Sequence, residues 1–315
     1  MAIGGGDGST KANAITVQTL EDLLTANDNN SQKFIEVTQD INPANEAWYP
    51  GFILTQNIKN HIFSNSHHKI VGVCVVGEYI TGSTTASTEG TMEVGFHNLE
   101  MLNWVFKDTS TRTQVGNVHI LSAPSSTKAL YFSDCEFSVK LVLNTNTRLI
   151  CMSTLLYATD CSFYFQFGSG GGIVAPVEGL NASSCSKTTR CNIVFDGAQD
   201  TVIQYVGSSS AVLNTVSFVY KNCKNVRASQ SSTSQLINNT NAVSMCNTFL
   251  NCTYSRNYTC IGSQLHIIAT DAPSGTFTSG SANTIIATTV DSSDPDFATT
   301  SIKSKDFLIS CGFLP

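Results

Sequence analysis

Acidic residues beside cysteines are the first candidates for chemistry in this sequence. Asp134 and Glu136 flank Cys135, and Asp160 precedes Cys161, which lies 26 residues after Cys135. On neighbouring parallel strands, Asp134 and Asp160 would stack roughly 4.7–4.9 Å apart and could form a carboxylate pair for acid–base catalysis. Asp also tolerates left-handed backbone and hydrogen-bonds its own turn. We expect the turn role and no catalytic residue, with these three acids as the only candidates to test.

A second acidic stretch could bind a hard cation. DSSDPD (291–296) offers Asp291, Asp294 and Asp296, but it lacks the glycine and terminal Glu of an EF-hand, so we expect a solvated turn. The adjacent His67 and His68 would point to opposite sides of a strand. The other histidines are isolated, and no HExxH or zinc-type Cys/His spacing occurs. The sequence predicts neither a metal nor a cofactor.

Motifs for phosphate binding and nucleophilic catalysis are also absent from the sequence. GSGGG (168–172) lacks the GK[ST] of a phosphate-binding loop, and no GxSxG occurs. Tyr164, between Phe163 and Phe165, could stack on a sugar or contact another subunit. Contact with a subunit is favoured, because an exposed aromatic on a smooth β face is an interaction liability.

Composition limits the class of protein. Only 13% of residues are charged, against about 25% in average globular domains, and Asn, Ser and Thr supply the polar surface instead, which favours an all-β chain. The net charge of −6 without a basic run argues against nucleic-acid binding. The sequence contains no run of about 18 apolar residues, so it predicts no membrane-spanning helix, and its first residues do not resemble a secretory signal. We expect the 11 cysteines to be mostly free and buried.

The elements that would position these residues are short strands in a repeating pattern. YFSDCEFSVKL (131–141) and LYATDCSFYFQF (156–167) alternate apolar and polar residues, and Phe137, Val139 and Leu141 align with Phe163, Phe165 and Phe167. A strand that recurs about every 25 residues predicts a solenoid, in which each turn buries its inner face against the next. Looser copies of the Asp/Asn-Cys element are expected at Cys185, Cys223 and Cys252. We therefore expect Cys135 and Cys161 to be reduced, buried and one turn apart.

The regions outside this pattern define the expected organisation. Leucines at helical spacing follow Thr19, a candidate N-cap with Asp22 three residues on, and predict a short helix before a strand at 34–41. We expect a flexible or partner-docking arm at 1–14 and an N-terminal cap at 15–60. A parallel β-helix would occupy 61–290 and a tail 291–315.

The chain resembles right-handed parallel β-helix proteins of the pectate-lyase-like superfamily, and more narrowly those of phages and prophages. The resemblance rests on TLEDLL (19–24), TQDIN (38–42), KIVGVCV (69–75), the repeated Asp/Asn-Cys elements and the close KDFLISCGFLP (305–315). It implies an all-β, right-handed parallel β-helix with a short N-terminal capping helix.

The same resemblance implies a role in a phage particle. It suggests a virion protein of the tail or an appendage, often a homotrimer, which binds other virion proteins and in some cases a host-surface glycan. We expect a structural rather than an enzymatic role. A tailspike polysaccharide lyase or hydrolase is the alternative, because that class shares the fold but needs clustered acids in a groove.

Overall fold

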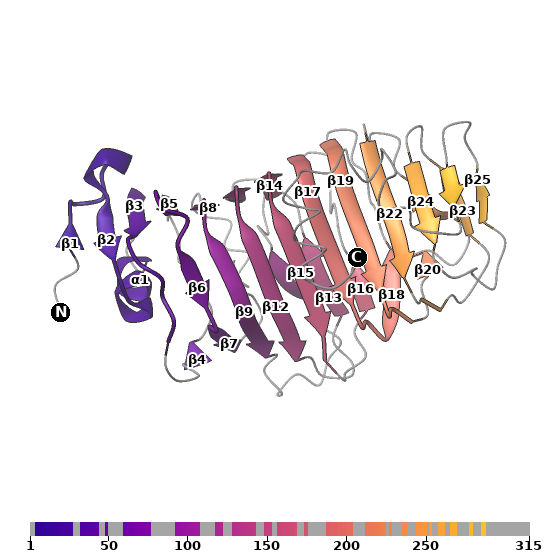
Figure 1. Ribbon diagram of the computed structural model, residues 1–315, viewed down its shortest axis with the longest axis horizontal. Helices are drawn as coiled ribbons and strands as arrows, with labels where there is room; N and C mark the ends of the chain where they lie inside the picture. The colour runs from indigo at the N-terminus through magenta and orange to yellow at the C-terminus, as the bar shows by residue number, and fades with distance from the viewer. Residues whose placement is uncertain are drawn as a thin grey trace.

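Parallel β-strands make up most of the chain that the structure describes. The computed structural model describes residues 4–27, 32–43, 48–49, 59–76, 92–107, 117–121, 128–142, 148–152, 156–168, 173–175, 187–203, 212–224, 227–228, 235–238, 244–250, 252–253, 258–261, 265–269, 277–279 and 285–287. The strands follow one another along the long axis, from the indigo β2 (Ile15–Val17) to the yellow β25 (Phe277–Ser279) (Figure 1). Among the described strands, only β1 (Gly4–Gly5) and β2 pair antiparallel. The prediction of an all-β chain with little helix is therefore confirmed.

The N-terminal region contains the two helices of the described residues. They are the short 3-10 helix η1 (Lys11–Asn13) and the α-helix α1 (Leu20–Asn27), which lies beside β2 and β3 (Gln32–Val37). Thr19 Oγ1 accepts a hydrogen bond from Asp22 N at 3.1 Å, so the predicted N-cap is confirmed. Leu20 and Leu23 are buried on the inner side of α1. Within the described residues, no helix is long and apolar enough to cross a membrane.

The remaining strands form rows in which each strand pairs in parallel with its equivalents before and after it in the chain. The first row contains β5 (Lys59–Phe63), β8 (Met92–His97), β11 (Lys128–Ser133) and β14 (Leu156–Thr159). The second row contains β6 (Lys69–Val71), β7 (Cys74–Val76), β9 (Glu100–Lys107), β12 (Glu136–Val142) and β15 (Ser162–Phe167), with β4 (Trp48–Tyr49) beside β7. Along the chain, each strand of the first row is therefore followed by strands of the second row before the chain returns to the first row.

The long strand β17 (Lys187–Asp196) joins the first two rows, because it pairs with both β14 and β15. It is followed in the same array by β19 (Val212–Lys221), β22 (Ser244–Leu250), β24 (Leu265–Ala269) and β26 (Ile285–Ala287). A third row contains β10 (Asn117–Leu121), β13 (Arg148–Met152), β16 (Ile173–Ala175), β18 (Asp200–Ile203) and β20 (Arg227–Ala228). A separate sheet contains β21 (Gln235–Asn238), β23 (Tyr258–Ile261) and β25.

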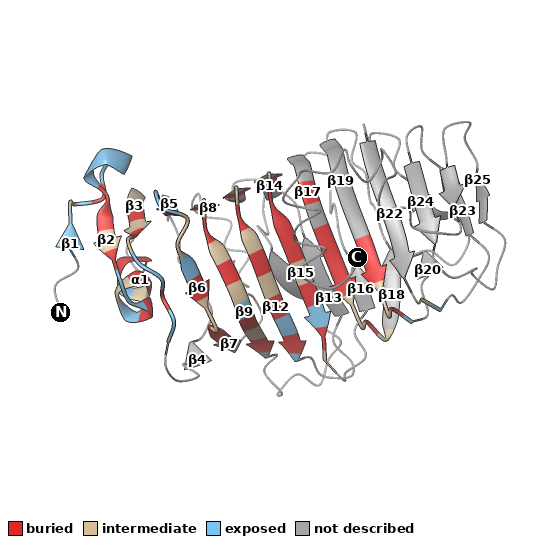
Figure 2. Ribbon diagram, viewed as in Figure 1, coloured by how far each residue is buried: buried red, intermediate tan, exposed pale blue. Residues whose placement is uncertain are grey.

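The register between β12 and β15 is the one that the alternation predicted. Phe137 lies beside Phe163, Val139 beside Phe165 and Leu141 beside Phe167. These side chains are buried, whereas Lys140 and Gln166 between them are exposed, and Figure 2 shows the same alternation of red with tan and pale blue along β9 and β12. A period of two residues places one side of each strand inside, so the alignment of the two stretches is confirmed.

Aromatic rings stack along the interior from strand to strand. The ring of Phe165 lies 5.5 Å from that of Phe195, which lies 5.5 Å from that of Tyr220, with near-parallel planes. Phe96 and Phe132 stack in the same manner at 5.3 Å in the first row. Because equivalent residues of parallel strands lie side by side, a run of aromatic residues at one position produces a continuous stack.

The first corner, between the first and second rows, consists of Asn98–Leu99, Asp134–Cys135 and Asp160–Cys161. Asn98, Asp134 and Asp160 have left-handed backbone, with φ of 54°, 54° and 55°. The next residue in each pair is buried. Backbone hydrogen bonds cross the corner from strand to strand, such as Ser162 N to Cys135 O at 2.9 Å. The corner therefore combines a residue type that tolerates left-handed backbone with a small or apolar one inside.

Two of the looser copies of the Cys element, Cys223 and Cys252, do not lie at this corner, so that part of the repeat prediction is wrong. Thr189 pairs with Thr159 and Asn192 with Ser162, which makes Cys191 the equivalent of Cys161. Cys185 lies outside the described residues.

Cys223 instead lies at a second corner, after the second row. There Gly197 and Asn222 are left-handed, with φ of 83° and 52°. Lys224 N donates to Ala198 O at 2.7 Å, and Thr253 N donates to Cys223 O at 3.0 Å, which places Cys252 at this corner too. A left-handed residue before a small buried one suits both corners, so the dipeptide alone does not distinguish them.

Candidate functional site

Asp134 and Asp160 occupy equivalent positions of the first corner. Each follows the last residue of a first-row strand, and Asp134 N donates to Thr159 O at 3.0 Å. Their left-handed φ values give both a structural reason to be Asp. The structure thus brings this candidate pair together on consecutive strands, in the geometry of a turn.

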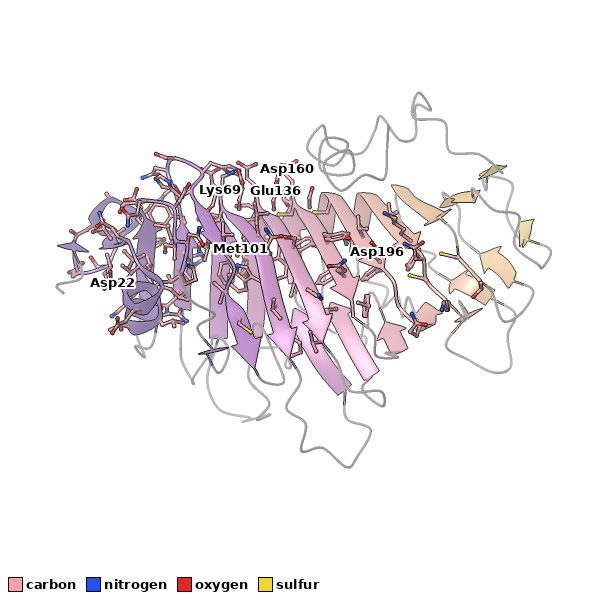
Figure 3. The ribbon with its side chains drawn as sticks, turned by 60° about the horizontal axis from the view of Figure 1, so that its bottom comes forward. Asp22, Lys69, Met101, Glu136, Asp160 and Asp196 are labelled. Atoms are coloured by element: carbon pink, nitrogen blue, oxygen red, sulfur yellow. The ribbon has the colours of Figure 1, made fainter. Side chains whose placement is uncertain are left out.

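Glu136 lies in a charged patch on the outer face. It pairs in register with Glu100, which itself pairs with Lys69. Glu100 Oε2 lies 2.8 Å from Lys69 Nζ, and Glu100 Oε1 lies 3.3 Å from His67 Nε2. The hydrogen bond from Lys69 to Glu100 raises the pKa of Lys69. Figure 3 shows Lys69, Glu136 and Asp160 along one edge of the molecule, away from Asp196.

The adjacent histidines contact different carboxylates. His67 reaches Glu100, whereas His68 Nδ1 lies 3.1 Å from Asp40 Oδ1. Asp40 Oδ1 also accepts from Lys69 N at 3.0 Å, and these two hydrogen bonds, the backbone bond first, lower the pKa of Asp40. Within the described residues, no group of three or more His, Cys, Asp or Glu could hold a metal ion. Asp291, Asp294 and Asp296 lie outside the described residues.

Cys135 and Cys161 have the properties expected of interior residues. Both are fully buried and free of disulfides, and the residue after Cys161 donates a backbone hydrogen bond from Ser162 N to Cys135 O across the first corner. Burial is the main cause that raises the pKa of both thiols, so they stay protonated at neutral pH. The prediction of reduced, buried cysteines on successive strands is confirmed.

Tyr164 lies on the partly exposed side of β15. Its hydroxyl donates to Asp196 Oδ2 at 2.9 Å, while Asn222 Nδ2 donates to Asp196 Oδ1 at 2.9 Å. The tyrosine is thus tied to the next strand and the second corner. Whether its ring also contacts a sugar or another subunit stays a prediction.

A hydrogen-bonded group of two histidines and a serine lies on the outer face of the first row. Ser133 Oγ lies 2.7 Å from His97 Nδ1, and His97 Nε2 lies 3.0 Å from His61 Nδ1. All three side chains are partly exposed. Burial, the neighbouring His61 and the Lys11 cation lower the pKa of His97 to about 4, so its imidazole is neutral at pH 7.

The sequence alone did not predict this group, because its three members are isolated from one another in the sequence. The signal was present in GFHNLEM (95–101), which aligns with YFSDCEF (131–137) at an offset of 36. The alignment superimposes His97 on Ser133, Asn98 on Asp134 and Glu100 on Glu136, and the structure pairs these residues or their strands.

Comparisons with protein-family models, curated proteins and solved structures find no significant match to this chain.

Proposed function

We propose that the chain is a right-handed parallel β-helix that serves as a structural component of a phage particle, in a tail appendage, spike or capsid-attached fibre. The observation that carries the proposal is the continuous register of parallel strands with one buried side. Equivalent strands pair from β5 through β8 and β11 to β14, and from β9 through β12, β15, β17, β19, β22 and β24 to β26. Such an array makes a stiff, elongated scaffold.

The rows of strands support the solenoid part of this proposal. The chain passes from β8 to β9 to β10 and then to β11, β12 and β13, each beside its predecessor in the same row. Parallel pairing with crossovers through other strands is what a β-helix requires, and right-handed crossovers are the rule for parallel strands. In this proposal α1 caps the N-terminal end, where an uncovered core would meet solvent.

The biological part rests on the sequence resemblance to phage and prophage proteins at TLEDLL (19–24), TQDIN (38–42) and KIVGVCV (69–75). The protein would be located in the virion, assemble as a homotrimer, bind other virion proteins and take part in host attachment. The N-terminal segment would serve as a docking element. A host-surface glycan is a further candidate ligand.

Mass spectrometry of purified particles, with antibody labelling in electron micrographs, tests this role. We expect the chain in stoichiometric amounts at one place on the particle. Light scattering of the purified chain should give a mass about three times the 33.8 kDa of one chain. Absence from washed particles would refute the virion role, and a monomer at micromolar concentration would refute the trimer.

A tailspike lyase or hydrolase is the second candidate, because Glu100 and Glu136 pair in register on the outer face beside Lys69. A pair of carboxyl groups is what most glycoside hydrolases use to cleave the glycosidic bond. Depolymerisation of host capsule by the purified chain, lost in Glu100→Gln and Glu136→Gln and retained in the exposed control Gln166→Ala, would support the enzyme. An inactive wild-type chain would leave the structural role.

A further inference from the structure

The strand register assembles Ser133, His97 and His61 from three separate strands. Phe63 pairs with His97 and His97 with Ser133, while His61 pairs with Gly95 on the same strand as His97. The two links, 2.7 Å from Ser133 Oγ to His97 Nδ1 and 3.0 Å from His97 Nε2 to His61 Nδ1, are hydrogen-bond distances. A hydroxyl, a base and a residue that orients the base therefore form one chain of contacts.

The hydrogen bonds allow a consistent set of proton positions for nucleophilic chemistry. When the Ser133 hydroxyl donates to His97 Nδ1, His97 carries its proton on Nε2 and donates it to His61 Nδ1. A neutral base that accepts from a serine and is held by a third residue is the general arrangement of an activated nucleophile. His97 is neutral at pH 7 because burial and nearby positive charge lower its pKa.

Gly95 provides the space in which the two histidines meet. A Cβ at this position would overlap both His97 Nε2 and His61 Nδ1. Other residues in the same row of outward positions carry large side chains, with Phe34 and His61 before Gly95 and Tyr131 after it. The absence of a side chain at 95 is thus a steric requirement of the histidine pair.

A cation and two further aromatic rings surround the histidine pair. Lys11 Nζ lies 4.9 Å from the centre of the Phe63 ring, the register neighbour of His97, and its charge acts on His97. The rings of Phe34 and Tyr131 lie 5.5 and 6.3 Å from that of His61 and give the site apolar walls.

Ser133 also lies at the partly exposed end of its strand. It is the last residue of β11, and Asp134 after it turns with left-handed backbone. The turn leaves the serine side chain partly exposed on the outer face, while Phe132 before it is buried. Ser133 is therefore partly open to a molecule in solution.

We propose that Ser133, His97 and His61 form an acyl-transfer site that cleaves O-acyl esters, with Ser133 as nucleophile, His97 as base and His61 as the positioning residue. Ser133 Oγ bonds to the ester carbonyl carbon while its proton passes to His97 Nδ1. The bond to the leaving alkoxide then breaks, and the alkoxide takes that proton. Water next attacks the acyl-serine, gives a proton to His97 Nδ1, and releases the carboxylic acid as the proton returns to Ser133.

A fluorophosphonate probe tests the nucleophile directly, because it forms a stable bond with an activated serine. We expect the intact wild-type chain to add one phosphonyl group, located on Ser133 by peptide mass spectrometry, and to hydrolyse p-nitrophenyl acetate. Ser133→Ala should abolish both. His97→Asn should slow both about 10²- to 10⁴-fold, the usual contribution of a general base. Thr159→Ala, at the register neighbour of Ser133, is the matched control and should change neither.

The role of His61 is tested by a pair of variants with different acceptors. His61→Asn keeps an oxygen that can accept the Nε2 proton of His97 and should retain most of the labelling rate, whereas His61→Leu should lose it about 10-fold or more. A wild-type chain that leaves Ser133 unlabelled refutes the proposal. Equal labelling in the wild type and His97→Asn, or equal loss in both His61 variants, also overturns the assigned roles. Circular dichroism confirms that each variant is folded.

Discussion

Acid should destabilise this protein through His97, and the size of the effect follows from its surroundings. Burial first, then His61 and Lys11, lower its pKa from the usual 6.5 to about 4 in the folded chain. The unfolded chain binds a proton at higher pH than the folded one, so the stabilisation is complete above pH 6.5. It is lost as the pH falls from 6.5 towards 4.

The size of the destabilisation follows from the size of the pKa shift of His97. One pKa unit corresponds to about 1.4 kcal/mol, which gives about 3 kcal/mol between pH 7 and pH 4. Because the imidazole of His97 is partly exposed, solvent screens part of this free energy, and we expect the free energy of unfolding to fall by about 2 kcal/mol. That loss is a large fraction of the roughly 5–15 kcal/mol that stabilises a typical domain.

Urea unfolding at intervals from pH 7 to pH 4 measures the effect, with His97→Asn as the comparison. The variant lacks the titrating imidazole, so its free energy of unfolding should fall by about 2 kcal/mol less than that of the wild type. Asp40, whose pKa is lowered by Lys69 N and His68, contributes equally to both chains and cancels in the difference. Parallel curves for the two chains would refute the assignment of the acid sensitivity to His97.

Substitutions at three features, namely the buried face of a strand, the first corner and the N-cap of α1, also test the fold. Phe163→Ala, at a fully buried aromatic, should cost about 3–5 kcal/mol in urea unfolding, whereas the exposed Gln166→Ala should change stability by less than about 0.5 kcal/mol; equal effects would contradict the assigned faces. Asp134→Val should cost about 1–2 kcal/mol because of its left-handed φ of 54°, and Asp134→Gly should be close to neutral by thermal unfolding; the reverse order would contradict the corner. Thr19→Ala should cost about 1 kcal/mol, measured in the same way, and no loss would argue against the cap.

The strand pair at 131–141 and 156–167 could be predicted from the sequence, because one alternation appears twice. Phe137 and Phe163 must share a side of their strands, and a period of two residues sets the register. The N-cap at Thr19 could be predicted for a similar reason, since a local hydrogen bond determines it. In both cases the relevant interactions are encoded within a few residues or in two nearly identical segments.

The positions of the later cysteines and the group of Ser133 with its two histidines could not be predicted from the sequence in the same way. Cys223 and Cys161 follow residues of the same kind, yet they lie at different corners, because the structure needs left-handed backbone at both. His61, His97 and Ser133 meet only because three strands pair. Their contact depends on the register between strands that are joined by segments of unequal length. No short stretch of the sequence determines that register.

The first corner has a consequence for how the chain can change in length. Asn98 and Asp134 are 36 residues apart and Asp134 and Asp160 are 26 apart, yet all three have the same backbone conformation and join the same rows. The difference of about ten residues is therefore absorbed elsewhere between successive corners. One residue added at the corner, by contrast, would misalign both rows at once.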